Sequence, residues 1–166
     1  MRVIVVMGVS GSGKTTVGTA LADSLGVEYA EADTFHPQAN IDKMTAGTPL
    51  TDTDRWPWLR AIADWIGEHA ETGGVVTCSA LKRDYRDILR TGGPAWFLHL
   101  HGDRALIAKR METRSGHFMP VSLLDSQLAD LQPLAATEDG LTVDLALGPD
   151  EIVQLALDAV GERDTL

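Results

Sequence analysis

Short apolar runs alternate along the chain with longer stretches in which apolar residues recur every three or four positions. The first pattern is typical of strands buried on both faces, and the second of helices with one buried face. The apolar runs predict five strands, at 3–7, 27–30, 75–78, 95–100 and 141–145. The helical spacing predicts helices at 14–25, 38–46, 54–71, 82–91, 103–114, 121–131 and 149–161. Strands that are separated by helices predict an α/β fold whose parallel sheet is covered by helices on both faces.

A glycine-rich loop, Gly8 to Thr15, joins the first predicted strand to the first predicted helix. It matches G-x-x-x-x-G-K-[ST], the phosphate-binding P-loop or Walker A motif. Its glycines free the backbone to curl so that several N–H groups point inward, and the helix adds the positive end of its dipole. We predict that Lys14 binds the transferred phosphate and that the Thr15 hydroxyl binds Mg²⁺. The expected nucleotide contacts in this region are Gly8, Ser10, Gly11, Ser12, Gly13, Lys14, Thr15 and Thr16.

Length and composition fit one domain, residues 1–166, since 44% of the residues are hydrophobic and can form a packed core. The net charge of −10 argues against a general nucleic-acid binder, and no apolar run is as long as a membrane span. The single cysteine, Cys78, excludes an internal disulfide and suits a reducing compartment. Because Met1 leads directly into the first strand, no signal peptide is expected. We therefore expect a cytoplasmic protein with neither a nucleic-acid nor a membrane partner.

The positive charges are concentrated in one part of the chain. Eight of the 14 Lys and Arg residues lie between 82 and 114, and none lies between 115 and 162. In an acidic protein this clustering indicates an anionic ligand. The alternative is a pair of solvated helix faces, and we favour that interpretation for Arg83, Arg90 and Arg104.

The P-loop predicts a phosphoryl donor but does not identify the acceptor. There is no N-K-x-D motif for guanine, and the strand at 75–78 ends in Cys78-Ser79 rather than in a second acidic Mg²⁺ ligand. This leaves the small-molecule kinases, in which a carboxylate after the second strand does the acid–base work. Asp33 is at that place, as the base for the acceptor hydroxyl or as a ligand of Mg²⁺ through water. The alternative is that Asp33 only caps the following helix.

Several motifs, in order and with matching spacing over residues 3–135, resemble the gluconate kinase (gluconokinase) family. They are Asp33-Thr34-Phe35-His36-Pro37, Asn40-Ile41-Asp42-Lys43-Met44, residues 47–55, Pro57-Trp58-Leu59, Cys78-Ser79-Ala80-Leu81-Lys82 with Tyr85-Arg86, and Arg114-x-Gly116-His117-Phe118. The resemblance implies ATP-dependent phosphorylation of D-gluconate at its 6-hydroxyl, giving 6-phosphogluconate and ADP. It also implies a fold similar to shikimate and adenylate kinases, with a five-stranded sheet of order 2-3-1-4-5, and commonly a homodimer.

Gluconate is a carboxylate with five hydroxyls, so its site needs a cation at one end and hydrogen-bonding groups along its length. Arg55 and Arg86 can each hold a carboxylate through two hydrogen bonds, and we expect one or both to do so. The alternative is a structural ion pair, with Asp52 or Asp54 as the natural partner of Arg55. The further substrate-binding candidates are Asp33, His36, Lys43 and Lys82. His36 could instead organise its loop, and Ser79 could be a plain helix N-cap.

Arg110 and Arg114 are four residues apart and so share one helix face. With the loop that follows, they resemble the mobile lid of the small kinases, here about residues 110–125, with Gly116 as a plausible hinge. The resemblance implies that Arg110 stacks on adenine and that Arg114 contacts the phosphates during transfer, while His117 and Phe118 receive no chemical role.

The chain departs from the family pattern at Glu31 and Ala32, where the family's D-G-D motif has Asp and Gly, and the longer carboxylate could shift the waters of Mg²⁺. Two other functions stay open. One is a shikimate kinase-like enzyme for another small hydroxy acid, and the other is a nucleotide-binding module without turnover.

Overall fold

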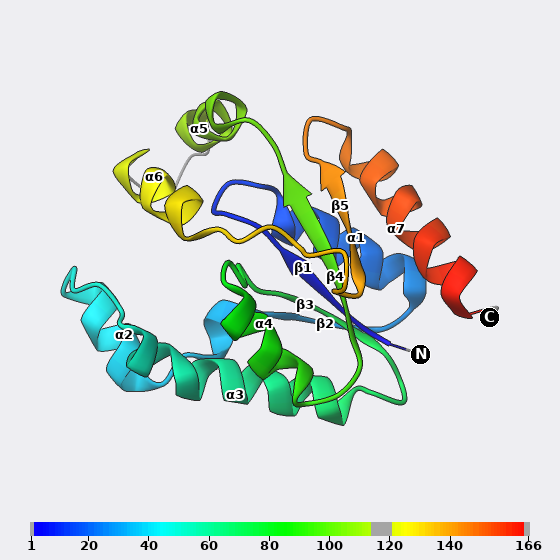
Figure 1. The fold of residues 1–166 in the computed structure, drawn as a ribbon, viewed down its shortest axis with the longest axis horizontal. Coiled ribbons are helices and arrows are strands. Elements are labelled where there is room, and N and C mark those ends of the chain that lie inside the picture. Colours follow the sequence, from blue (N-terminus) through cyan, green and yellow to red (C-terminus); the bar gives the residue numbers. More distant parts are fainter. Residues whose placement is uncertain (1, 114–120, 165–166) are drawn as a thin grey trace.

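The structure is a computed structural model that describes residues 2–113 and 121–164. Its centre is a parallel sheet of five strands, β1 (Val3–Met7), β2 (Glu28–Glu31), β3 (Gly74–Thr77), β4 (Ala95–His101) and β5 (Gly140–Asp144) (Figure 1). The strands lie in the order β2-β3-β1-β4-β5. The predicted α/β class and strand order are confirmed.

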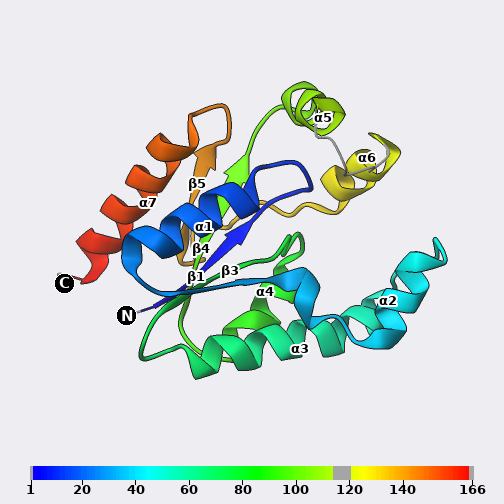
Figure 2. The ribbon, with the colours of Figure 1, turned by 180° about the vertical axis from the view of Figure 1, so that it is seen from behind.

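Helices cover both faces of the sheet, as Figures 1 and 2 show from opposite sides. One face carries α1 (Lys14–Leu25) and α7 (Pro149–Asp164), and the other carries α3 (Asp52–Glu68) and α4 (Arg83–Arg90). Beyond the carboxyl ends of the strands lie α2 (Gln38–Thr45), α5 (Arg104–Thr113) and α6 (Val121–Asp130). A short 3₁₀ helix, η1 (Ala32–Phe35), follows β2 and was not predicted.

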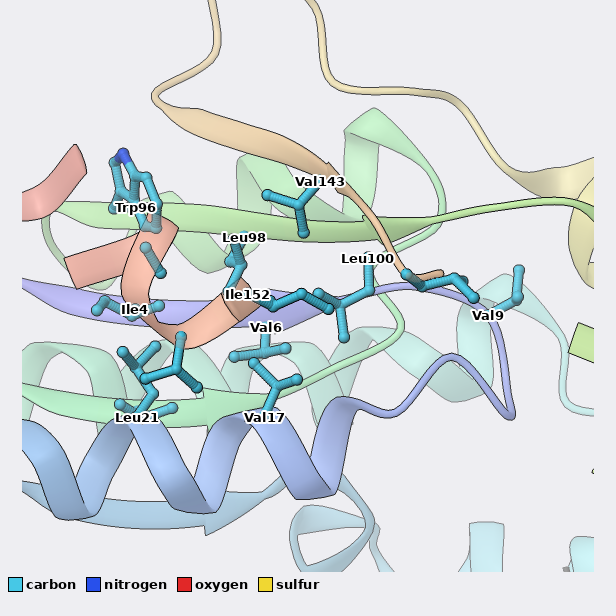
Figure 3. Packing of buried hydrophobic residues seen from close by; sticks show 14 of the residues in the cluster. Ile4, Val6, Val9, Val17, Leu21, Trp96, Leu98, Leu100, Val143 and Ile152 are labelled. Atoms are coloured by element: carbon cyan, nitrogen blue, oxygen red, sulfur yellow. The ribbon is translucent and has the colours of Figure 1, made fainter. Parts of the chain in front are cut away.

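Alternate residues of the central strands point to opposite faces, so the sheet has a core on each side. Ile4 and Val6 of β1 pack with Val17 and Leu21 of α1, as Figure 3 shows. Their neighbours Val3, Val5 and Met7 belong to the core on the α3 side. β1 is thus buried on both faces. The P-loop begins directly after it, at the carboxyl edge of the sheet, where ligands of such sheets bind.

The predicted helix boundaries agree with the structure to within three residues, and two of the smaller differences at helix starts have local causes. The helix predicted to start at 54 begins at Asp52, because Thr51 is its N-cap and forms a capping box with Asp54. The helix predicted from 82 begins at Arg83 with Lys82 as N-cap, so Ser79 is not a cap as the alternative reading proposed. Ser79 lies instead in a loop where Ala80 has a left-handed φ of 46°.

The predicted lid, residues 110–125, has its central part, 114–120, outside the described residues. None of the helices in the described part of the chain combines the length and the apolar character needed to span a membrane.

Candidate active site

The P-loop has the backbone conformation that its glycines predict. Gly11 and Gly13 adopt left-handed φ angles of 80° and 94°, and Gly13 is the N-cap of α1. A Cβ atom at Gly8 would lie 2.8 Å from the carbonyl oxygen of Leu100, so a side chain there would clash with β4. A Cβ at Gly13 would meet nothing within 4 Å, so there is open space at the amino end of α1. Open space in front of helix N–H groups fits a phosphate.

The Lys14 side chain lies back over this loop. Its Nζ donates hydrogen bonds to the carbonyl oxygens of Gly8 (2.9 Å) and Val9 (3.1 Å). Main-chain carbonyls of the loop therefore hold the ammonium group. A phosphate oxygen can replace them as the hydrogen-bond acceptor.

Thr15, the predicted Mg²⁺ ligand, is oriented by a carboxylate from β2. Its hydroxyl donates to Oε1 of Glu31 at 2.8 Å, and the hydroxyl of Tyr29 donates to the same oxygen at 2.6 Å. Burial and the bond to Glu31 raise the pKa of Tyr29 to about 12, so the phenol stays protonated as a donor. No group of three or more metal-binding side chains occurs within residues 2–113 and 121–164. The Thr15 hydroxyl and the Glu31 carboxylate are hard oxygen donors, the type that Mg²⁺ prefers, and Mg²⁺ commonly keeps several waters and is shared with substrate phosphates.

Asp33 lies in η1, directly after β2, and its side chain is exposed. The turn around it is fixed, because the indole of Trp58 donates to the carbonyl of Ala32 at 2.7 Å and Thr34 donates to that of Glu31. The capping alternative is wrong, since Glu31 is the N-cap of η1 and Pro37 that of α2.

Asp33 and Lys14 both act on the buried thiol of Cys78, which follows β3. Burial raises the pKa of this thiol to about 12, the Lys14 charge lowers it and the Asp33 charge raises it further. The base candidate and the P-loop lysine are therefore both close enough to the end of β3 for their charges to act on the same thiol.

A second polar cluster consists of Asp52, Arg55, Lys82 and Tyr85. The Tyr85 hydroxyl donates to Oδ1 of Asp52 at 2.6 Å, and Arg55 Nη1 lies 3.2 Å from the same oxygen. The Lys82 ammonium is 3.7 Å from Asp52. The bond from Tyr85, with the Lys82 and Arg55 charges, lowers the pKa of Asp52. A single carboxylate thus holds two cations, Arg55 and Lys82, that are each about one-third exposed.

His36, directly after η1, lies where the charges of both Asp33 and Arg55 act on it. Its ring stacks on Trp58 with centroids 4.5 Å apart, and its Nδ1 lies 3.3 Å from the amide of Asn40. Burial and the Arg55 charge lower the pKa of His36, while Asp33 opposes them. The ring is therefore neutral at pH 7 and able to bond a hydroxyl, and it also anchors its loop.

Lys43 is held differently, by both carboxylate oxygens of Asp54 at 2.8 and 2.9 Å. These bonds and one from the Thr51 backbone lower the pKa of Asp54 to about 2. Of the two expected partners of Arg55, Asp52 is therefore correct and Asp54 is not.

Arg86 does not face the open cluster, and the structural ion pair is the alternative that the structure supports. Its side chain is fully buried, with Nε 2.7 Å and Nη2 2.9 Å from the two carboxylate oxygens of Glu138. Its Nη1 donates to the carbonyls of Ala80 and Leu81 at 2.8 and 3.3 Å. With its donors occupied in the protein interior, Arg86 supports the loop that carries Lys82 rather than binding a ligand.

The remaining predicted cations have mixed outcomes. Arg83 and Arg104 are surface residues, as expected, but Arg90 extends to the buried Glu138. Arg110 donates to the carbonyl of Leu145, at 2.8 Å, in the segment that joins β5 to α7. Arg114, with Gly116, His117 and Phe118, lies outside the described residues.

Sequence reasoning missed two residues, Glu138 and Gln127, and one contact. It named Glu31, the last residue of β2, as a departure from the family pattern, but it did not predict the hydrogen bond from the Thr15 hydroxyl. Glu138 and Gln127 are far from the motifs in sequence, and no pattern marked them. Gln127 contacts the P-loop directly, at Ser10.

The site and fold are those of a P-loop kinase. The shikimate kinase family model matches residues 10–153. A gluconokinase from Gluconobacter oxydans is 48% identical over 156 residues, which cover 92% of this chain and 88% of that protein.

Solved structures agree. A gluconokinase from Sinorhizobium meliloti superposes with a TM-score of 0.88 at 48% identity, covering 97% of this chain and 92% of the other. An unliganded sugar kinase from Janibacter sp. superposes with a TM-score of 0.90 at 52% identity, covering 97% and 95%. The chain belongs to the gluconokinase family, within the shikimate kinase-like P-loop kinases, and the predicted family is confirmed.

Proposed function

We propose that the chain is a gluconokinase, which transfers the γ-phosphoryl group of ATP to the 6-hydroxyl of D-gluconate and releases ADP and 6-phosphogluconate. Family membership at 48% identity to gluconokinases over about nine-tenths of the chain carries this proposal. The geometry supports it, because a phosphate loop and a cluster of cations and hydroxyl-binding groups lie at the same edge of one sheet.

In this proposal the P-loop binds the ATP phosphates through its main-chain N–H groups and the amino end of α1. The expected contacts are Gly8, Ser10, Gly11, Ser12, Gly13, Lys14, Thr15 and Thr16. Lys14 exchanges its bonds to Gly8 and Val9 for the transferred phosphoryl group. By resemblance to the small kinases, Arg110 stacks on the adenine and Arg114 contacts the phosphates during transfer.

The acceptor binds between Asp33 and the cluster around Asp52. Arg55, whose pairing with Asp52 is partly exposed, holds the gluconate carboxylate. Lys82, His36 and Lys43 bond the sugar hydroxyls. Asp33 accepts the proton of the 6-hydroxyl as its oxygen bonds to phosphorus and the bond to the ADP oxygen breaks.

Mg²⁺, when bound, neutralises charge on the phosphates. Thr15 would hold it directly and Asp33 through water, with Glu31 orienting the Thr15 hydroxyl. We also propose a cytoplasmic homodimer, which rests on the resemblance alone.

A coupled assay of ADP release over a panel of acceptors tests the proposal. The panel contains D-gluconate, other sugar acids and shikimate, with purified full-length protein, ATP and Mg²⁺. We expect turnover with D-gluconate at a kcat/KM above that for any other acceptor. ADP release with shikimate and none with gluconate would reject the proposal, and ATP binding without ADP release for any acceptor would indicate a non-catalytic module.

A further inference from the structure

A glutamine on α6 contacts the P-loop through two hydrogen bonds. The backbone N–H of Ser10 donates to Oε1 of Gln127 at 2.7 Å, and Nε2 of Gln127 donates to the Ser10 hydroxyl at 3.2 Å. Both side chains are partly buried. The two residues are 117 positions apart, so the contact is a tertiary one that depends on where α6 packs.

The position of α6 is fixed by its apolar face. Leu124 is fully buried, in the core cluster that also contains Val9 of the P-loop and Ile107 of α5. Gln127 follows Leu124 by three residues and therefore lies on the same face of the helix. Burial of Leu124 thus directs the amide of Gln127 at the loop.

Lys14 and Gln127 hold adjacent parts of the same turn. Lys14 bonds the carbonyls of Gly8 and Val9, and Gln127 bonds the N–H and the hydroxyl of the next residue, Ser10. When Lys14 moves to a phosphate, those two carbonyls lose their charged partner. The turn is then held by the bond from Ser12 to Val9, by the bond from Gly8 to Ser79, and by Gln127.

We propose that Gln127 is a positioning residue for the nucleotide: it keeps the first half of the P-loop in its phosphate-binding shape while Lys14 is engaged with phosphate. This inference rests on the proposed function, because it concerns the same donor site. It differs in that it concerns nucleotide affinity, which can be measured without any acceptor.

The same segment also contacts the loop on the acceptor side. Directly after α6, the backbone N–H of Gln132 donates to the carbonyl of Leu81 at 2.7 Å, and its side chain accepts from the N–H of Arg83 at 2.8 Å. Two glutamines five residues apart therefore connect the P-loop and the 78–82 loop through one segment. A shift of α6 would change both loops, so Gln127 is expected to affect kcat as well as nucleotide affinity.

The test measures the affinity of a non-hydrolysable ATP analogue with Mg²⁺ by calorimetry, for wild type, Gln127→Ala, Ser10→Ala and the double variant. Two lost hydrogen bonds of ordinary strength predict about a tenfold weaker affinity for Gln127→Ala. Ser10→Ala keeps the main-chain bond and should weaken binding less. Because the residues act as a pair, the double variant should be no weaker than Gln127→Ala.

Gln154→Ala serves as the matched control, since Gln154 of α7 is exposed and donates to Asp158 in its own helix. It should bind the analogue like the wild type. Thermal unfolding without nucleotide shows whether each variant is folded.

Unchanged or tighter analogue binding by folded Gln127→Ala would overturn the inference, and tighter binding would mean that the contact is a latch that must open. Additive effects of Ser10→Ala and Gln127→Ala would also contradict it. The binding assay contains no acceptor, so its outcome does not depend on whether gluconate is a substrate. The two proposals can therefore be rejected independently.

Discussion

Arg86 and Glu138 form a buried ion pair that joins α4 to the segment before β5, with both carboxylate oxygens of Glu138 within 2.9 Å of the Arg86 guanidinium. The same guanidinium bonds the carbonyls of Ala80 and Leu81, next to the left-handed turn at Ala80. The pair therefore fixes the loop that ends in Lys82, although neither member reaches the open cluster around Asp52.

Replacing Arg86 by Met should destabilise the protein strongly. Removing one partner of a buried ion pair costs about 3–5 kcal/mol. Arg90 still contacts Glu138 in this variant, so the loss should lie toward the lower end of that range. Urea unfolding at pH 7 measures the effect. Arg83→Met on the same helix is the control. The Arg83 side chain is exposed and lies 4.0 Å from Glu138, farther than Arg86 does, so this substitution should lower the free energy of unfolding much less. A stable Arg86→Met protein whose KM for gluconate rises alone would instead place Arg86 in the substrate site.

Stability should fall as the pH drops below 4.5, in part because of Glu138. Burial alone would raise the pKa of Glu138, but hydrogen bonds from Arg86 and Arg90 outweigh burial and lower the pKa from 4.5 to about 2. A pKa that is lower in the folded state contributes stability above the unfolded value, and this stability is lost as pH falls from 4.5 toward 2.

Urea unfolding of wild type and Glu138→Gln between pH 7 and 3 measures this contribution. The difference in unfolding free energy should be largest near pH 7 and should narrow below pH 4.5. A difference that is constant with pH would show that the Glu138 charge is not involved.

Arg55→Ala should raise the KM for gluconate about tenfold or more and leave that for ATP nearly unchanged. A charge-assisted hydrogen bond contributes about 1.5–3 kcal/mol, and Arg55 is a partly exposed arginine beside Asp33 and His36. Steady-state kinetics with each substrate varied provides the measurement. Arg60→Ala, at an exposed position on the same helix, is the control and should behave like wild type. An unaltered gluconate KM in Arg55→Ala would place the carboxylate elsewhere.

Glu31→Gln should raise the Mg²⁺ concentration needed for half-maximal activity by about tenfold. Groups that orient a metal ligand typically change metal affinity 10–100-fold, and Glu31 accepts the hydroxyl hydrogens of both Thr15 and Tyr29. Titration of activity with Mg²⁺ at fixed ATP tests it. Glu28→Gln on the same strand removes a carboxylate that bonds His69, and it should leave the Mg²⁺ requirement unchanged. Equal requirements in all three proteins would exclude Glu31 from this role.

Much of this architecture could be predicted from the sequence because it depends on local patterns. The apolar run at 3–7, the glycines at 8–13 and the spacing of Val17 and Leu21 each specify their own segment, so β1, the P-loop and α1 were located correctly. The side of the sheet on which Asp33 lies follows from its place after β2.

Pairings over long distances in the chain could not be predicted in this way. Whether Arg86 binds a substrate or Glu138 depends on how the segment before β5 packs against α4, and 52 residues separate the two. Arg55 had two acidic neighbours in the sequence, and helical spacing favours Asp52, three residues before it, over the adjacent Asp54. The bond from Tyr85 to Asp52 could not be predicted, because 33 residues separate the two. The contact of Gln127 with Ser10 depends on the packing of Leu124 in the same way.

The central claim is that Asp33 faces the P-loop and takes the proton from the acceptor hydroxyl. Its most direct test is kcat for gluconate in Asp33→Asn, measured together with the affinity of a non-hydrolysable ATP analogue. Loss of a general base predicts that kcat falls about 10²–10⁴-fold while analogue affinity stays within a few-fold of wild type. A kcat within a few-fold of wild type, in a folded variant that binds the analogue normally, would contradict the account.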